Sequence, residues 1–391
     1  MSRSARLPLA QVQIKHFKAI REATLTFTPL TVFIGNNGSG KSSVIEALET
    51  TQRLGLEDLD AALVPFGGYE HAHYKGEVRA RPRPQGERLL GSAPIHLALR
   101  GHTEHTPYSA MLTIEERENN EVFFSKEKMT YAGLTFERDA HSHISLMKKG
   151  KREDLHVHVI RPQNSLIGLN LGGFLGQWQF VRLNPDVMGR PIPMQRSGRE
   201  SRLAPDGSNV AQYLWSLRQE SPAAFEGLIA AAREVLPYAT DLQPAITQEL
   251  SRNVYLRLIE QKFEVFGWML STGTLRVLAL LALFRHPRPP PLVFIEELEN
   301  GLDPRTLALI VSEIRSAVLS GRQQVVVTTH SPYLLDLLDL SHIVLVERVE
   351  GTPVFRRPAD DAELSKWAHE FGYGPGTLYT RGELGRRGGA P

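Results

Sequence analysis

Residues 35–42, Gly-Asn-Asn-Gly-Ser-Gly-Lys-Ser, match the phosphate-loop pattern G-x-x-x-x-G-K-[ST] at every fixed position. Glycines let backbone N–H groups converge on phosphate oxygens, and the positive end of the following helix faces the same anion. We expect Lys41 to reach the β- and γ-phosphates of a nucleoside triphosphate and Ser42 to bind Mg²⁺. A glycine turn with a chance lysine is the alternative, which the strand-to-helix context of the loop disfavours.

Two carboxylates, Glu296 and Glu297, follow the apolar run 292–295. A strand that ends in two acids is how a phosphate-loop ATPase places one carboxylate on the magnesium shell and a second on the attacking water. His330 follows the run 325–329 in the same way, and open α/β sheets bind ligands where parallel strands end. A solvated acidic loop and a structural histidine are the alternatives. The phosphate loop in the same chain disfavours both.

Residues 270–276, Leu-Ser-Thr-Gly-Thr-Leu-Arg, open an apolar helix expected over 274–284. Their hydroxyl and N–H groups form a helix start that can bind an anion. Taken alone, this segment is only a helix cap.

The elements that must position these residues lie at both ends of the chain. We expect two short strands within 12–27, a buried strand over 30–34, and a helix from Ser42 onward. Near the C-terminus we expect a strand over 292–295, a helix over 304–319 and a strand over 324–328. This β-α-β order implies a parallel sheet with a right-handed crossover. A last strand is expected over 343–346.

The middle of the chain, residues 51–261, is less regular. Strand-like pieces are expected over 95–99, 110–114 and 155–160, and helices after the turn 205–208 and over 222–235.

Composition narrows the class of protein. The chain has 391 residues, 45 basic and 43 acidic side chains, and a net charge of 45 − 43 = +2, so DNA contact requires a local patch. There is no cysteine, which excludes disulfides, thiolate zinc sites and cysteine nucleophiles. The longest apolar run, residues 277–284, is far below the roughly 18 residues needed to span a bilayer. We therefore expect a cytoplasmic protein with no membrane partner.

Two kinds of feature have more than one interpretation. The pairs His141/His143 and His156/His158 would lie on one face of strands and could hold zinc, but surface strands are the favoured alternative. The basic segment 148–152 could contact phosphates, although a solvated basic hairpin is favoured, and Arg196, Arg199 and Arg202 are similar.

In combination, the motifs resemble the ABC-type ATPase heads of the RecF/SMC superfamily, and most closely the stand-alone bacterial ATPases of the AAA family. The matching segments are 14–20 and 30–34 as the first strands, 35–43 as Walker A, 270–276 as the signature motif, Glu296 and Glu297 as the Walker B end, 300–304 as the D-loop, and 328–332 as the switch-histidine motif. Glu296 stands where most ABC ATPases have Asp, and Leu298 replaces the usual proline. No Q-loop glutamine can be assigned.

The resemblance implies an α/β phosphate-loop NTPase of the ABC-head type, with a mixed sheet flanked by helices. Residues 1–50 and 262–360 would form the head, 51–261 an inserted α+β lid or arm, and 361–391 a C-terminal extension. It also implies a homodimer with ATP and Mg²⁺ sandwiched between the heads. The nucleotide-binding residues of one subunit would be Asn36, Asn37, Gly38, Ser39, Gly40, Lys41, Ser42 and Ser43, with Ser271, Gly273 and Thr274 contributed by the other.

Roles in hydrolysis follow from the same resemblance. Glu297 would be the general base, His330 the γ-phosphate sensor, and Glu296, with Ser42, the magnesium-binding pair. The implied function is a switch that acts on DNA or on a nuclease-type effector encoded nearby, in genome maintenance or anti-phage defence. An ATP-binding clamp with negligible turnover is the alternative. The motor subunit of a transporter is disfavoured because residues 270–275 lack the glycine pair and glutamine of transporter signatures.

Overall fold

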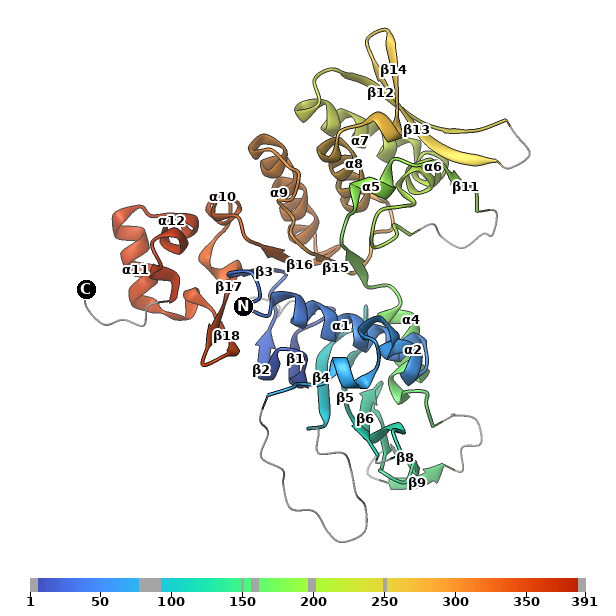
Figure 1. Cartoon of the computed structure of the whole chain (residues 1–391), viewed down its shortest axis with the longest axis vertical. Coiled ribbons are helices and arrows are strands. Elements are labelled where there is room, and N and C mark those ends of the chain that lie inside the picture. The colour runs from blue at the N-terminus through green and yellow to red at the C-terminus, as the bar shows by residue number, and fades with distance from the viewer. Residues whose placement is uncertain are drawn as a thin grey trace. The chain divides into compact units, whose positions relative to one another are not determined.

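The structure is a computed structural model that describes residues 6–76, 93–117, 119–148, 151–155, 162–195, 202–248 and 252–385. It describes only the backbone of residues 152–155, 367 and 369. The chain divides into two compact units (Figure 1), the first comprising Met1–Trp178 and Val344–Asp360 and the second Gln179–Ile343 and Asp361–Pro391. The division into a head and an inserted arm expected from the motifs is a different partition, and it stays a prediction.

An eight-stranded antiparallel sheet dominates the first unit, in the order β2-β1-β4-β5-β6-β7-β8-β9. Alternating burial, as along β5, shows that one face of its central strands covers a core. Its strands are β1 (Gln11–Phe17), β2 (Ile20–Thr26), β4 (Ile95–His102), β5 (Pro107–Glu116), β6 (Val122–Tyr131), β7 (Leu134–Arg138), β8 (Ile144–Lys148) and β9 (Lys151–Leu155). The strands expected within 12–27, 95–99 and 110–114 are confirmed. The middle segment therefore extends the sheet that the N-terminal strands begin.

Two helices pack closely in the first unit, α1 (Lys41–Leu56) and α4 (Leu166–Leu175). A Cβ atom at Gly172 would lie 2.7 Å from the carbonyl oxygen of Gly55, so glycine is required for this close approach. Both helices contact strands of the large sheet, as Figure 1 shows. The shorter helices of this part are α2 (Leu59–Leu63), η1 (Val64–Phe66) and α3 (Tyr69–Ala72).

The phosphate loop follows β3 (Leu30–Ile34), whose five residues are all buried, as expected for this run. β3 lies beside β17 (Ile343–Val349), which pairs antiparallel with β18 (Thr352–Arg356), and η4 (Pro358–Asp360) follows. The last strand expected over 343–346 is therefore confirmed, and it continues into a hairpin.

Parallel strands form the centre of the second unit. β10 (Gln179–Val181), β15 (Leu292–Ile295) and β16 (Gln324–Thr329) pair in parallel, with Leu292 opposite Gln324 and Ile295 opposite Val327. The connecting helix α9 (Pro304–Leu319) has the expected bounds, and Asp303 caps it by accepting hydrogen bonds from two backbone N–H groups. The β-α-β unit predicted from the apolar runs is therefore confirmed.

Helices and a small antiparallel sheet complete the second unit. α8 (Thr272–Arg285) contacts α7 (Pro222–Val235), α6 (Val210–Glu220) and α9. The remaining elements are α5 (Pro185–Met188), β11 (Ile192–Pro193), β12 (Ala239–Ile246), β13 (Asn253–Glu260), β14 (Phe263–Phe266), η2 (Gly267–Met269), α10 (Pro332–Asp336), η3 (Leu340–His342), α11 (Ala362–Phe371), α12 (Pro375–Thr380) and η5 (Glu383–Gly385). The two helices expected over 210–217 and 222–235 are confirmed.

Several expectations have a different outcome. His141 and His143 lie in the turn between β7 and β8, not on a strand, because Asp139 accepts hydrogen bonds from both of their backbone N–H groups. Within the described ranges, no group of three or more metal-ligating side chains comes together. Within the basic segment 148–152, Lys148 lies opposite Lys151 in the antiparallel pairing of β8 and β9, and residues 149 and 150 lie outside the described residues. His156, His158, Arg196 and Arg199 lie outside the described residues, as does the expected strand 155–160 beyond Leu155.

None of the described helices has both the length and the apolar character needed to cross a membrane.

Candidate functional site

The phosphate loop of the first unit has the backbone that its sequence predicts. Gly38 and Gly40 have φ values of 72° and 111°, in the left-handed region that favours glycine. Gly40 occupies the cap position of α1 and makes no side-chain capping bond, and the N–H end of a helix favours an anion.

Lys41 begins α1 and is only 5% exposed. Its ammonium group donates hydrogen bonds to the carbonyl oxygens of Gly35, at 2.7 Å, and Asn36, at 3.1 Å, and to Ser39 Oγ at 3.5 Å. The lysine therefore lies along the loop, with its charge held beside the backbone that would surround phosphate oxygens. Ser42, the next residue, is exposed, whereas Ser43 is buried.

The hairpin of β17 and β18 packs against this loop within the first unit. A Cβ atom at Gly35 would lie 2.1 Å from the carbonyl oxygen of Val346, and one at Gly40 would lie 2.6 Å from the ring of Pro353. The two glycines are required because the hairpin leaves no room for a side chain. This contact brings residues more than 300 positions apart in the sequence to the same loop.

The acidic residues of the second unit follow β15. Glu297 has a φ of 50°, a left-handed conformation that costs a non-glycine residue on the order of 1–3 kcal/mol. Its backbone N–H donates to Thr328 Oγ1 at 3.0 Å, and the Asn300 side chain donates to its carboxylate. These bonds from β16 and the D-loop hold the residue in this conformation, which leaves its side chain exposed.

His330 comes directly after β16 and lies beside the acids. Its Nε2 atom is 4.0 Å from Glu297 Oε1, and its backbone N–H donates to Glu299 Oε1 at 2.6 Å. The structure thus brings Glu297 and His330 together within the second unit, as the parallel-strand argument predicted. The sequence analysis did not assign a functional role to Glu299. Its place two residues after Glu297 was a signal that could have drawn attention to it.

Arg182 is a second residue that sequence reasoning missed. It directly follows β10 and forms an ion pair with Glu296, which directly follows the neighbouring strand β15. The pair forms because Val181 and Ile295 are in register, so the next residue of each strand lies at the same sheet edge. No sequence motif marks Arg182.

The signature segment opens α8 as a helix cap. Ser271 Oγ accepts the backbone N–H of Thr274 at 3.1 Å and lies 2.8 Å from Thr274 Oγ1. Ser271 is exposed, Gly273 is half-buried, and Thr274 is buried with its hydroxyl inside the cap. A Cβ atom at Gly273 would lie 2.6 Å from the carbonyl oxygen of Gly301, so the helix start packs directly on the D-loop.

Arg276, in the first turns of α8, provides positive charge near the acids. It donates a hydrogen bond to the carbonyl oxygen of Leu183 at 2.7 Å. Burial lowers its pKa, and the negative charges of Glu297 and Glu299 act in the opposite direction. The second unit therefore contains a cation within electrostatic range of both carboxylates.

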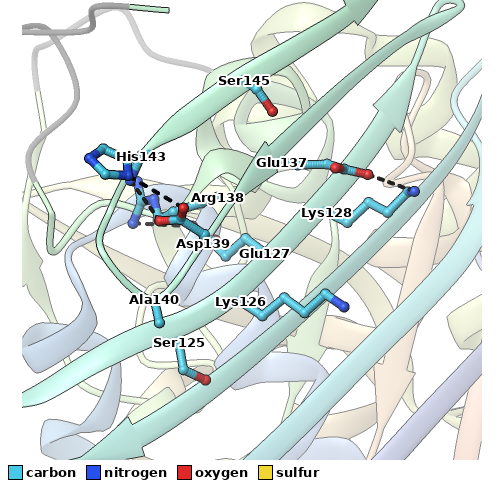
Figure 2. Close-up of a pocket in the computed structure, with 10 residues that line it drawn as sticks. All are labelled: Ser125, Lys126, Glu127, Lys128, Glu137, Arg138, Asp139, Ala140, His143 and Ser145. Carbon is cyan, nitrogen blue, oxygen red and sulfur yellow. Dashed lines mark hydrogen bonds and ion pairs between the residues drawn. The ribbon is translucent and has the colours of Figure 1, made fainter. Parts of the chain in front are cut away.

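A pocket of about 290 Å³ lies elsewhere in the first unit, on β6, β7 and the start of β8 (Figure 2), and none of its lining residues belongs to the phosphate loop. Its lining residues include Glu127 and Arg138, whose side chains are each 1% exposed. Arg138 Nη1 lies 3.1 Å from Glu127 Oε2. Glu127 accepts hydrogen bonds from Ser165 Oγ and the Leu166 N–H at the start of α4, while Arg138 donates to the carbonyl oxygens of Pro162 and Asn164. The ion pair thus fastens the segment before α4 to the sheet, which is a structural role.

Together, the fold and the phosphate loop define the class of protein: the chain carries a phosphate loop on a fold that is similar to that of SMC head domains. Residues 30–336 match a family model described as "AAA domain, putative AbiEii toxin, Type IV TA system", and the chain belongs to this family. No curated protein matches the sequence. The resemblance inferred from the motifs is confirmed.

Two solved structures show the same fold at low identity. One is an Smc head bound to the C-terminal winged-helix domain of ScpA, with 13% identity, a TM-score of 0.53, and coverage of 89% of this chain and 96% of that chain. The other is an Smc head with an extended coiled coil bound to the C-terminal domain of ScpA from Pyrococcus furiosus, with 14% identity, a TM-score of 0.51, and coverage of 92% and 99%. At such identities the likeness establishes the fold alone.

Proposed function

We propose that the chain hydrolyses ATP with Mg²⁺ at a head-to-head dimer interface and acts as a switch. The observation that carries this proposal is the cluster at the mouth of β15 and β16, where Glu297 and His330 lie 4.0 Å apart. A carboxylate beside an imidazole, in a chain that also has a complete phosphate loop, is the arrangement that activates water against a γ-phosphate.

The chain's own residues would do the following work. Lys41 and the N–H groups at the start of α1 would bind the β- and γ-phosphates, since the lysine already lies along that backbone. The hydroxyl of Ser42 and the carboxylate of Glu296 are hard oxygen donors, which fit Mg²⁺. The ion would neutralise charge on the phosphate oxygens. Glu297 would accept the proton of water, and His330 would orient the γ-phosphate.

The signature residues would act on the nucleotide of a second subunit. Ser271 is exposed at the cap of α8 and Gly273 is next to it, so this helix start can be presented to another molecule. In this proposal Ser271, Gly273 and Thr274 of one subunit close the site formed by residues 36–43 of the other. Thr274 would contribute by holding Ser271 at the helix start, because both its backbone N–H and its hydroxyl are engaged with Ser271 Oγ.

The switch is proposed to act on DNA or on a nuclease-type effector. Its proposed role is in genome maintenance or anti-phage defence, in the cytoplasm. Both similar Smc heads are bound to a domain of ScpA, which supports the idea that a head of this fold can carry a protein partner. The description of the family mentions a toxin of a toxin–antitoxin system, which is compatible with a defence role.

The alternative function is an ATP-binding clamp that assembles a partner complex with negligible turnover. Glu297→Gln separates the two functions, and Glu226→Gln on the exposed side of α7 is a matched control. For a switch, Glu297→Gln should lower kcat by about 10²- to 10⁴-fold, the usual contribution of a general base, and accumulate an ATP-bound dimer in size-exclusion chromatography. If its turnover and dimer fraction equal those of the control, the switch is wrong and the clamp is favoured.

A further inference from the structure

Glu299 lies four residues beyond Ile295, the last residue of β15 in the regular ladder with β16. The ladder pairs run from Leu292 and Gln324 to Ile295 and Val327. Beyond them, the loop after β15 still contacts β16 and the residue that follows it: the Leu298 N–H donates to the carbonyl oxygen of Thr328 at 3.3 Å, and the His330 N–H donates to Glu299 Oε1 at 2.6 Å. A side-chain carboxylate thus replaces the backbone acceptor that β15 no longer supplies.

The hydrogen bond from the His330 N–H to the Glu299 carboxylate is expected to be strong. It is a charge-assisted hydrogen bond at the short end of the range for N–H donors, and bonds of this kind are roughly twice as strong as neutral ones. Because the bond is made by the backbone N–H of His330, it fixes the position of the residue's main chain, from which the imidazole projects. It does not involve either ring nitrogen. The imidazole keeps its approach to Glu297, at 4.0 Å, and can also meet substrate.

Glu299 is badly placed to act on water itself. Its Oε2 atom is buried and receives no hydrogen bond from the part of the chain that the structure describes, and its Oε1 atom is taken by His330. Arg276 lies within electrostatic range of this carboxylate. The side chain is therefore oriented inward, toward the backbone of the switch histidine.

We propose that Glu299 is a positioning residue that holds His330 at the mouth of β16 and links it to the D-loop. This inference rests on the proposed function, because it assigns a role in ATP hydrolysis that is exerted only through the His330 imidazole. The same loop carries Gly301, whose carbonyl oxygen contacts Gly273 at the signature helix. A shift of the signature segment on meeting a second subunit would then reach His330 through residues 299–301.

A double-mutant cycle tests this role. Glu299→Ala should lower kcat by about 10- to 100-fold, as expected for losing one hydrogen bond to a charged group, and leave the KM for ATP within about twofold. Glu299→Gln keeps an acceptor oxygen and should recover most of the activity. Glu226→Ala, exposed on α7, serves as the control for the loss of a glutamate.

The decisive comparison is made in a His330→Ala background, which keeps the backbone N–H but removes the imidazole. There, Glu299→Ala should change kcat by less than about twofold, because the group that it positions is gone. Multiplicative losses in the double variant, or a Glu299→Ala enzyme as active as the control, would overturn the positioning role while leaving the proposed function intact. Full turnover in His330→Ala alone, or none in the unmodified protein, would instead overturn the proposed function and this role with it.

Discussion

Replacing Arg138 with Met is expected to destabilise the first unit strongly. The variant keeps most of the side-chain volume but removes the charge that faces Glu127 and two donors to the segment before α4. Both partners are 1% exposed, and removing one partner of a buried pair costs about 3–5 kcal/mol. Because Glu127 keeps its hydrogen bonds from Ser165 and Leu166, we expect the free energy of unfolding to fall by the lower value, about 3 kcal/mol.

Urea unfolding at pH 7 measures this loss, and the melting temperature should fall by roughly 6–12 °C. The expected pH dependence follows from Glu127. Burial already raises the pKa of Glu127 above that of the unfolded chain, and losing Arg138 raises it further. The folded variant therefore binds a proton more readily than its unfolded state, so its loss of unfolding free energy should shrink as the pH is lowered from 7.

The double variant Arg138→Met/Glu127→Gln provides the control. The neutral amide still accepts the hydrogen bonds from Ser165 and Leu166, and no uncompensated charge is left inside. The double variant should thus be more stable than Arg138→Met. A loss below about 1 kcal/mol in the single variant, or a double variant that is less stable than the single one, would refute the reasoning.

Three further predictions concern the sites already described. Lys41→Ala should abolish ATP binding by the phosphate loop, and retained micromolar affinity in titration calorimetry would contradict the assignment of the loop. Ser271→Arg should leave ATP binding by the monomer intact but prevent the ATP-dependent dimer; an unchanged elution profile with ATP would contradict the role in trans. Asp303→Ala should cost about 1 kcal/mol in urea unfolding at pH 7 through loss of the α9 cap. Because the hydrogen bond from Thr306 lowers the pKa of Asp303, this contribution should be present above pH 4 and disappear as the pH falls through that lowered pKa; a cost that did not change with pH would argue against it.

How far the sequence predicted the structure differs between regions. The predicted bounds of α7 and α9 match the structure, and β15 and β16 match to within one residue, because long apolar periodicity and buried runs report local structure directly. The His141/His143 pair was placed on a strand wrongly, since a side-chain carboxylate, Asp139, caps a turn there. The C-terminal helices were not predicted at all. Of these, α12 packs on α10, where Asp336 accepts the N–H of Gly376 at 2.7 Å, a contact that no local pattern signals.

The sequence by itself determined the motifs on which the proposed chemistry depends, because a phosphate loop, two acids after a strand and a histidine after another are encoded in short contiguous segments. Only the tertiary structure decided which further residues join them. Arg182 meets Glu296 through the register of β10 and β15, Glu299 meets His330 across the end of a ladder, and Pro353 closes on Gly40 from the far end of the chain. Such contacts depend on strand order and register, which are set by packing between segments distant in the sequence and leave no signal in any one of them.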